Sequence, residues 1–266
     1  MLSGLIIYSN SDKDKNSWFI DKCIKKISAQ GFSLIYKDED DALNYAKTTH
    51  IDFAIYRSRN FDLVQQLESL GIKCFNNSLT NKVANNKYLS YQFFEEHKLP
   101  CLKSNLSSDK LSFPFVMKSV NGHGGTDVYL IHNECEISQN QKDGKKYIFQ
   151  QYYENNGDLR LYVLNKKVIG AVLRKNNSDF RSNFSLGGKV EKYEPEEEIV
   201  NLAIKVAKLL DADYIGVDFL KVNGGWLINE IEDPVGSRML YKASNIDSIE
   251  MFCDYICRVL NNKSSF

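Results

Sequence analysis

The sequence predicts a mixed α/β (α+β) fold, and three observations support this prediction. Short apolar runs alternate with helical patterns over residues 5–75, as in a parallel sheet covered by helices. A glycine-rich turn at residues 121–126 separates two apolar runs, which indicates antiparallel strands. A second pair of apolar runs, Ile215–Leu220 and Trp226–Ile231, flanks Asn223-Gly224-Gly225 and predicts a hairpin.

The overall composition gives no sign of a polyanionic partner. The chain has 266 residues, enough for two or three subdomains with cores of their own. Hydrophobic residues make up 43% and charged residues 26%, and 34 basic residues balance 34 acidic ones. Because the net charge is zero, nucleic acid is not expected as a partner. Composition leaves the oligomeric state open, with a homo-oligomer as one alternative.

The sequence shows no segment for a membrane or for secretion. No apolar run approaches the roughly 20 residues that span a bilayer. The start, MLSGLIIYSN, lacks the basic and long apolar regions of a signal peptide. The six cysteines form no CxxC pair, which favours reduced thiols. A cytoplasmic protein without a membrane partner is therefore expected.

Residues 1–78 are predicted to form a Rossmann-like lobe with a parallel sheet. Apolar runs give its strands and amphipathic patterns give its helices. The expected strands are Leu5–Ser9, Phe32–Tyr36, Ile51–Tyr56 and Gly71–Phe75, and the expected helices are Asp12–Gln30, Ala42–Thr48 and Asp62–Leu70. No GxGxxG motif follows the first strand, which argues against a dinucleotide site.

Two arginines follow the third strand of this lobe. Arg57 and Arg59 stand at the carboxyl end of that strand, where open α/β sheets bind ligands. A guanidinium there can hold a substrate carboxylate through two hydrogen bonds. The alternative interpretation is a pair of solvated loop arginines, and Arg57 is the favoured substrate-binding candidate.

Residues 79–148 are predicted to form a small lobe that carries two lysines. A helix over Asn81–Lys98 places Lys87 near its start. The next predicted strand, Phe113–Val120, embeds Lys118 among apolar neighbours. The glycine-rich turn and a further strand, Asp127–Ile131, come directly afterwards. This arrangement can close backbone N–H groups around phosphate oxygens, although an ordinary turn is the alternative.

Residues 149–266 are predicted to form the last lobe. Its expected elements are the strands Lys146–Gln151 and Val168–Arg174, a helix opened by Pro195, the hairpin and the helix Ser248–Leu260. The polar segment Asn176–Gly188 predicts a loop between these elements.

Three carboxylates interrupt the apolar runs of the hairpin. Asp218 lies in the middle of the first run, and Glu230 and Glu232 lie two apart in the second, so that both point to one face. Neighbouring carboxylates repel unless a cation lies between them. The pattern favours a magnesium site, because all-oxygen ligand sets suit that ion, over solvent-exposed polar positions.

The order of these features resembles the ATP-grasp superfamily, and most closely its RimK-type (alpha-L-glutamate ligase-like) carboxylate–amine ligases. The resemblance spans Ile51 to Tyr255 and is densest in three places. These are Phe149-Gln150-Gln151-Tyr152 through Asp158-Leu159-Arg160, Asp179-Phe180-Arg181-Ser182-Asn183 through Gly187-Gly188, and Gly216-Val217-Asp218 through Glu230. The resemblance implies that a two-lobed ATP-grasp fold follows the parallel-sheet lobe.

The resemblance also implies how ATP is bound. Lys87 and Lys118 would contact its phosphates, and the loop that contains Gly122, Gly124 and Gly125 would close over them. Lysines at these places agree with the need to neutralise a highly charged nucleotide.

Further ATP contacts are implied on the strands around the adenine and the ribose. The residues concerned are Gln150, Gln151, Tyr152, Asp158 and Arg174.

The catalytic and metal-binding roles come from the resemblance as well. Arg181 and Asn183 would face the γ-phosphate and the reacting carboxylate, and Ser182 between them would be a further ATP contact. Two magnesium ions would be held by Asp218, Glu230 and Glu232.

The sequence departs from the family at two places. Glu232 stands where family members commonly have asparagine, which could tighten metal binding, favour manganese or turn the side chain aside. The segment Asp233-Pro234-Val235-Gly236-Ser237-Arg238 replaces the usual turn of small residues. Arg238 is therefore a candidate carboxylate binder, with a structural salt bridge as the alternative.

The implied function is an ATP-dependent ligase. A substrate carboxylate would form an acylphosphate with release of ADP, and an amine would then attack it and release phosphate. Small molecules or peptides are the expected substrates, and because no added peptide-recognition domain is seen, small substrates are favoured. The alternatives are a nucleotide-binding regulatory protein without ligase activity and a carboxylate kinase.

Overall fold

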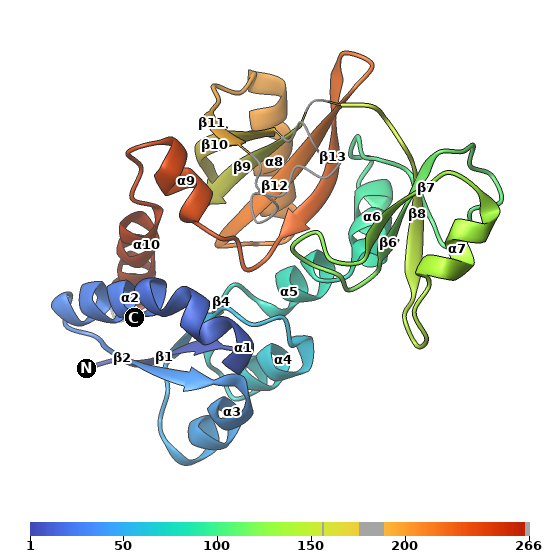
Figure 1. The fold of residues 1–266 in the computed structure, drawn as a ribbon. Helices are drawn as coiled ribbons and strands as arrows, with labels where there is room; N and C mark the ends of the chain where they lie inside the picture. The colour runs from blue at the N-terminus through green and yellow to red at the C-terminus, as the bar shows by residue number, and fades with distance from the viewer. Residues whose placement is uncertain (156, 176–188, 264–266) are drawn as a thin grey trace.

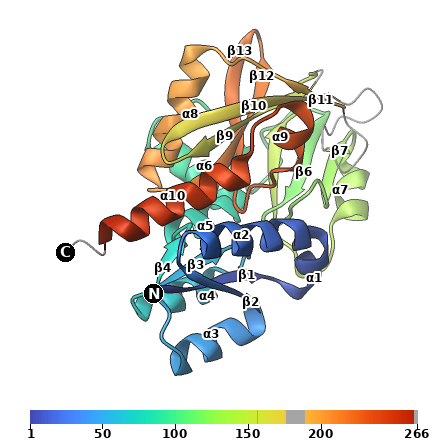
Figure 2. The same cartoon turned by 90° about the vertical axis from the view of Figure 1, so that its left-hand side faces the viewer.

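The computed structural model describes residues 1–155, 157–175 and 189–263, and these residues contain three sheets (Figure 1). The parallel and antiparallel sheets confirm the mixed α/β class. The sheets follow one another along the chain, and the C-terminal helix returns to the N-terminal sheet (Figure 2). The segment Asn176–Gly188, predicted as a loop, lies outside the described residues.

The first sheet is parallel, with strand order β2-β1-β3-β4. Its strands are β1 Ser3–Tyr8, β2 Ser33–Asp38, β3 Phe53–Tyr56 and β4 Lys73–Phe75, and its helices are α1 Asn10–Lys13, η1 Asp14–Asn16, α2 Ser17–Ala29, α3 Glu39–Thr48 and α4 Phe61–Ser69. Residues of β1 alternate between two cores, since Ile6 packs with the α2 side and Leu5 with the α3 and α4 side. Buried apolar strands covered on both faces agree with the sequence pattern.

Two of the predicted helices are divided in the structure. The segment expected as Asp12–Gln30 forms α1, η1 and α2, and the segment expected as Asn81–Lys98 forms α5 Ser78–Ala84 and α6 Lys87–Glu96. Asn86 causes the second break, because it has extended backbone angles and its side chain accepts hydrogen bonds from the N–H groups of Tyr88 and Leu89. This cap fixes Lys87 as the first residue of α6.

The second sheet of the chain is small and antiparallel, with order β5-β8-β6-β7. Its elements are β5 Ser104–Asn105, β6 Phe115–Ser119, β7 Val128–Ile131, α7 Glu134–Asn140 and β8 Tyr147–Gln151. Phe115, Met117, Tyr147 and Phe149 form its core. The alternation that buries these residues leaves Lys118 on the opposite face of β6.

The third sheet has the order β11-β10-β9-β12-β13 and carries helices on both faces. Its elements are β9 Asp158–Leu164, β10 Lys167–Lys175, β11 Lys189–Lys192, α8 Glu197–Leu209, β12 Tyr214–Val222, β13 Gly225–Glu232, α9 Arg238–Ala243 and α10 Ser248–Lys263. Leu161 on β9 packs with α8, and its neighbour Tyr162 packs with α9 and α10. The expected elements did not include β9, nor the short elements α7, α9, β5 and β11.

The C-terminal helix α10 joins the last part of the chain to the first. Lys22 and Lys26 on α2 form ion pairs with Asp247 and Glu250 at the start of α10. Cys253 and Cys257 of α10 lie in the same core as Cys23 of α2. Within the described residues, no helix is both long and apolar enough to cross a membrane.

Replacing Gly157 by alanine is expected to lower the free energy of unfolding by about 2–4 kcal/mol. Gly157 has φ of +145°, and a Cβ there would lie 2.0 Å from the backbone oxygen of Arg174 on the adjacent strand. Urea unfolding followed by circular dichroism measures the change. Gly144→Ala is the control, because Gly144 has φ of +75° but a Cβ added there would meet no atom within 4 Å. Equal losses for the two variants would contradict the close approach.

Candidate functional site

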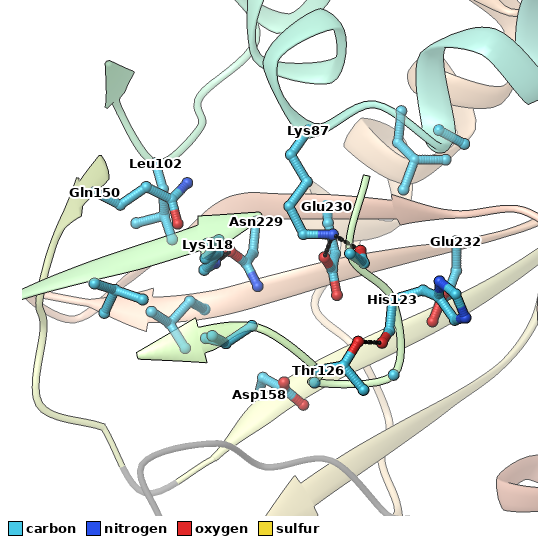
Figure 3. Close-up of a pocket in the computed structure, with 18 of the residues that line it drawn as sticks. Lys87, Leu102, Lys118, His123, Thr126, Gln150, Asp158, Asn229, Glu230 and Glu232 are labelled. Atoms are coloured by element: carbon cyan, nitrogen blue, oxygen red, sulfur yellow. Dashed lines mark hydrogen bonds and ion pairs between the residues drawn. The ribbon is translucent and has the colours of Figure 1, made fainter. Parts of the chain in front are cut away.

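The first cavity lies between the small antiparallel sheet and strand β13 (Figure 3). It contains about 1080 Å³ of space, counting the part open to solvent. It is lined by α6, β6, the glycine-rich loop, the end of β8, the start of β9, the end of β10 and the second half of β13. Elements far apart in the sequence therefore supply one wall each.

Lys87 reaches into this cavity from the first turn of α6. Its Nζ lies 3.4 Å from Oε2 of Glu230 and donates to the backbone oxygen of Gly122 in the glycine-rich loop (Figure 3). The side chain of Lys87 is 15% exposed and that of Glu230 is 27% exposed. The ammonium group thus links the loop to β13 and stays accessible from the cavity.

Lys118 lies on the opposite wall, on β6. Its Nζ donates a hydrogen bond of 3.0 Å to Oδ1 of Asn229. Burial lowers the pKa of Lys118 to about 8, while the charge of Glu230 opposes this shift and that of Lys87 adds to it. An anion entering the cavity would stabilise the ammonium form.

The glycine-rich loop covers the cavity between β6 and β7. Gly124 and Gly125 have φ of +64° and +80°, values that glycine adopts without strain. The backbone oxygen of His123 accepts hydrogen bonds from the N–H and hydroxyl of Thr126, at 3.2 and 2.7 Å. Burial, followed by the charge of Arg59, lowers the pKa of His123. Hydrogen bonds within the turn therefore hold its shape, and its imidazole lies among charges of both signs, the positive ones of Arg59 and Lys87 and the negative ones of Asp12 and Glu232.

The residues predicted around the adenine line the same cavity. Gln150 donates to the hydroxyl of Ser104 at 2.6 Å, and Gln151 donates to two backbone oxygens of the segment before β6. Tyr152 follows β8 and lines the cavity too. These contacts fix the side-chain amides at one end of the cavity, away from Glu232.

Asp218 is completely buried under this site and is held by two arginines. Its carboxylate accepts bonds of 2.6 and 2.7 Å from Arg160 on β9 and a bond of 2.6 Å from Arg174 on β10. Burial alone would raise the pKa of Asp218, but the charges of Arg160 and Arg174 lower it overall. The carboxylate is therefore ionised and fully paired.

The remaining predicted carboxylates differ in how they are engaged. Glu232 accepts a bond of 3.0 Å from Arg160, and Asp158 pairs with Arg174. Glu230 and Glu232 both line the first cavity, whereas Asp218 does not. A bulge places Asp218 opposite Glu230 but Phe219 opposite Ile228, which leaves Asn229 as the extra residue.

The repulsion among these carboxylates is relieved by guanidinium groups in the structure. Arg160 lies between Asp218 and Glu232, and no group of three His, Cys, Asp or Glu in the described residues is placed to hold a metal ion. Glu230 and Glu232 offer oxygen ligands toward the cavity and fit a magnesium ion. Asp218 does not fit one in this arrangement, because both its oxygens accept bonds from arginine.

A second cavity adjoins the first and contains both predicted substrate-binding arginines. Arg57 is 4% exposed, and it donates to the hydroxyl of Tyr8 and the backbone oxygen of Val235. It is therefore not a solvated loop residue. Arg238 begins α9 and is exposed, and among the described residues it forms no ion pair.

Some residues of the site were missed and others lie outside the described residues. Arg181, Ser182 and Asn183 belong to the second group. Arg160 and Asn229 are the residues that the sequence did not single out. Arg160 stands in the Asp158-Leu159-Arg160 motif, and the strand period places it on the same face as Asp158. That period was the signal that could have identified Arg160.

The chain was compared with known protein families and structures. Residues 84–256 match the family described as RimK-like ATP-grasp domain. The uncharacterised MG011 homolog of Mycoplasma pneumoniae is 30% identical over 248 residues, which cover 90% of this chain and 86% of the relative. A probable alpha-L-glutamate ligase of Haemophilus influenzae (strain Rd) is 27% identical over 258 residues, which cover 88% and 85% of the two chains.

The fold is similar to that of a solved ligase. The crystal structure of D-alanine–D-alanine ligase from Bacillus anthracis complexed with ATP aligns with a TM-score of 0.77. The alignment covers 99% of both chains at 16% sequence identity, so it bears on the fold alone. The predicted ATP-grasp fold is confirmed by these similarities.

Proposed function

Because the chain belongs to the RimK-like ATP-grasp family of C–N bond-forming ligases, we propose that it joins an amino acid or peptide carboxylate to an amine through an acylphosphate, with release of ADP and phosphate. The observation that carries this proposal is the first cavity. It brings two lysines, a glycine-rich loop and two accessible carboxylates together, beside a second cavity rich in arginine.

Each wall of the first cavity has a part in binding the nucleotide under this proposal. Lys87 and Lys118 neutralise the phosphates, and the loop of Gly122, Gly124 and Gly125 covers them. The adenine lies toward Gln150, Gln151 and Tyr152, with Asp158 nearby. Glu230 and Glu232 would hold magnesium, which draws negative charge from the phosphates during transfer.

The buried arginines provide fixed positive charge where the two cavities meet. Asp218 fixes the guanidinium groups of Arg160 and Arg174, and Arg174 lines both cavities. A cation held in place before the reaction stabilises the charge that develops on phosphoryl transfer. The substrate carboxylate therefore lies beside Arg174 and Glu232, with Arg181 and Asn183 as further candidates for the same task.

The reaction needs positioning more than it needs a nucleophilic side chain. The substrate carboxylate attacks the γ-phosphate and the ADP oxygen leaves, which forms the acylphosphate. The ammonium form of the acceptor loses one proton to solvent, and the neutral amine then forms the C–N bond. Phosphate leaves, and a second proton passes from the nitrogen to it. Closing the cavity protects the acylphosphate from water, and the glycine-rich loop is placed to do so.

An ADP-release assay tests the proposal directly. Purified protein with ATP and magnesium is supplied with pairs of amino acids and small peptides. We expect ADP and phosphate to appear in equal amounts with an amide product, and Glu230→Gln to reduce the rate at least about tenfold. ATP binding without turnover across the whole panel would indicate the regulatory protein instead. Acylphosphate that accumulates when no amine is present would indicate the carboxylate kinase.

A further inference from the structure

The second cavity lies between the N-terminal lobe, which is outside the residues that match the family, and residues of the matching part. Asp12 of α1, Trp18 of α2 and Arg59 after β3 line it, opposite Glu232 and Arg238 from the last lobe. It has about 1050 Å³ of space, counting the part open to solvent. Residues 84–256 carry the family match, so Asp12 and Arg59 are features that the family assignment leaves unexplained.

Arg59 lies at the boundary, because it lines both cavities. In the described part of the chain, four lysine and arginine side chains line the first cavity, and they are Arg59, Lys87, Lys118 and Arg174. The partners of Lys87 and Lys118 lie in the wall of the first cavity. Arg174 pairs with Asp158 in the same wall and with Asp218 in the core beneath it. Arg59 instead pairs with Asp12, which lines the second cavity and not the first.

The ion pair between Arg59 and Asp12 can be exchanged for a stronger one. It is a single contact of 3.0 Å, and the two side chains are 30% and 28% exposed. Partly exposed pairs of this kind contribute little to stability. A phosphate accepts two parallel bonds from a guanidinium and carries more negative charge, so phosphates in the first cavity would compete effectively for Arg59.

Release of Arg59 would leave Asp12 as an unpaired carboxylate facing the second cavity. A carboxylate there is complementary to an ammonium group, which is the form of an amine at neutral pH. The same cavity presents Arg238, whose exposed guanidinium is complementary to a carboxylate. A free amino acid carries both groups, whereas a simple amine or an amino-acid amide lacks the second.

We propose that Asp12 binds the ammonium group of a free amino-acid acceptor, and that Arg59 covers Asp12 until nucleotide phosphates draw the guanidinium into the first cavity. This inference rests on the proposed ligase function for the identity of the nucleotide. It assigns Asp12 and Arg59 a role in acceptor recognition, and it predicts that the nucleotide binds before the acceptor.

Binding of AMPPNP with magnesium, measured by calorimetry, tests the exchange without any acceptor. Asp12→Asn should bind about two- to fivefold more tightly than wild type, because Arg59 is already free. Arg59→Gln should bind about tenfold more weakly, and the double variant should match Arg59→Gln alone. Arg258→Gln on the exposed face of α10 is the matched control and should change nothing. Additive effects, or weaker binding by Asp12→Asn, would overturn the exchange.

Acceptor recognition is tested with the twenty standard L-amino acids and their amides in the ADP-release assay. Asp12→Asn should raise the KM of the best amino acid at least about tenfold and leave the KM for ATP no higher than in wild type. Arg59→Gln should allow that amino acid to bind without AMPPNP, which wild type should not. An unchanged KM in Asp12→Asn, or an amide as good as its amino acid, would show that the acceptor role is wrong.

The two experiments separate failure of this inference from failure of the ligase function. If wild type turns over ATP with an amino acid but shows no coupling between Asp12 and Arg59, only the inference fails. If wild type releases ADP with small peptides but with no free amino acid, the acceptor class is wrong and the ligase function stands. If it binds AMPPNP but releases no ADP across the whole panel of amino acids and peptides, the ligase function itself fails.

Discussion

Replacing Asp218 by asparagine is expected to lower the free energy of unfolding by about 3–5 kcal/mol, even when no metal or nucleotide is present. The carboxylate is 0% exposed and accepts three hydrogen bonds from Arg160 and Arg174. An amide removes the negative charge and turns one acceptor into a donor that faces guanidinium N–H groups. Two buried arginines would then lack part of their compensating charge.

Urea unfolding in the presence of EDTA measures this loss. Asp211→Asn is the control, because Asp211 makes one ion pair with Lys166 and its side chain is 77% exposed. We expect that control to stay within about 0.5 kcal/mol of wild type. A carboxylate whose only task is to bind metal would give the opposite result, since removing its repulsion from Glu230 would leave the metal-free protein as stable or more stable.

The stability of Asp218→Asn shows whether Asp218 orients the buried arginines or serves only as a metal ligand. In the structure it orients Arg160 and Arg174, and of the three predicted metal ligands only Glu230 and Glu232 line the first cavity. Magnesium binding by the Asp218→Asn variant, corrected for the folded fraction, therefore reports on the predicted third ligand. We expect the variant to retain the magnesium affinity proposed for Glu230 and Glu232.

The sequence was sufficient where a local pattern determines the structure. The alternating apolar runs around Asn223-Gly224 predicted β12 and β13, because a tight turn fixes the pairing of its own strands. Lys118, on a strand before a glycine-rich turn, was placed in the same way, whereas Lys87 was expected in a helix but not as its first residue. Each of these predictions needs only neighbouring residues.

Long-range pairing could not be read from the same patterns. Arg160 and Arg174 pair with Asp218 because β9 lies between β10 and β12. That strand order is a property of the whole sheet. The ion pair of Asp12 with Arg59 joins residues 47 apart in the sequence. The helix break before Lys87 is local, but helical apolar spacing continues across Asn86 and hides its capping role.

Replacing Lys118 by methionine is expected to weaken nucleotide binding but to stabilise the folded protein. We expect AMPPNP binding to weaken by about 2–4 kcal/mol, or thirtyfold to a thousandfold, because a phosphate-facing cation is lost. The same change should raise the free energy of unfolding at pH 7 by about 1–3 kcal/mol, since wild type must hold a buried ammonium with one neutral partner. Loss of stability in this variant would contradict that assignment.

The pH dependence follows from the lowered pKa of Lys118, about 8 in the folded protein against 10.5 in an unfolded chain. Between these values the unfolded chain holds the proton and the folded chain does not, so the contribution of this group to wild-type stability rises with pH. The advantage of Lys118→Met is therefore complete below pH 8 and shrinks above it.

The affinity for the nucleotide changes with pH in the opposite direction to stability, because bound phosphates favour the ammonium form of Lys118. Wild-type affinity for AMPPNP should be complete below pH 8 and fall as the pH rises beyond that value, with proton uptake on binding. Lys118→Arg keeps its charge and should show no such step, while binding more tightly than Lys118→Met. If wild type and Lys118→Arg decline together, another group causes the decline, and Lys118 does not face the phosphates.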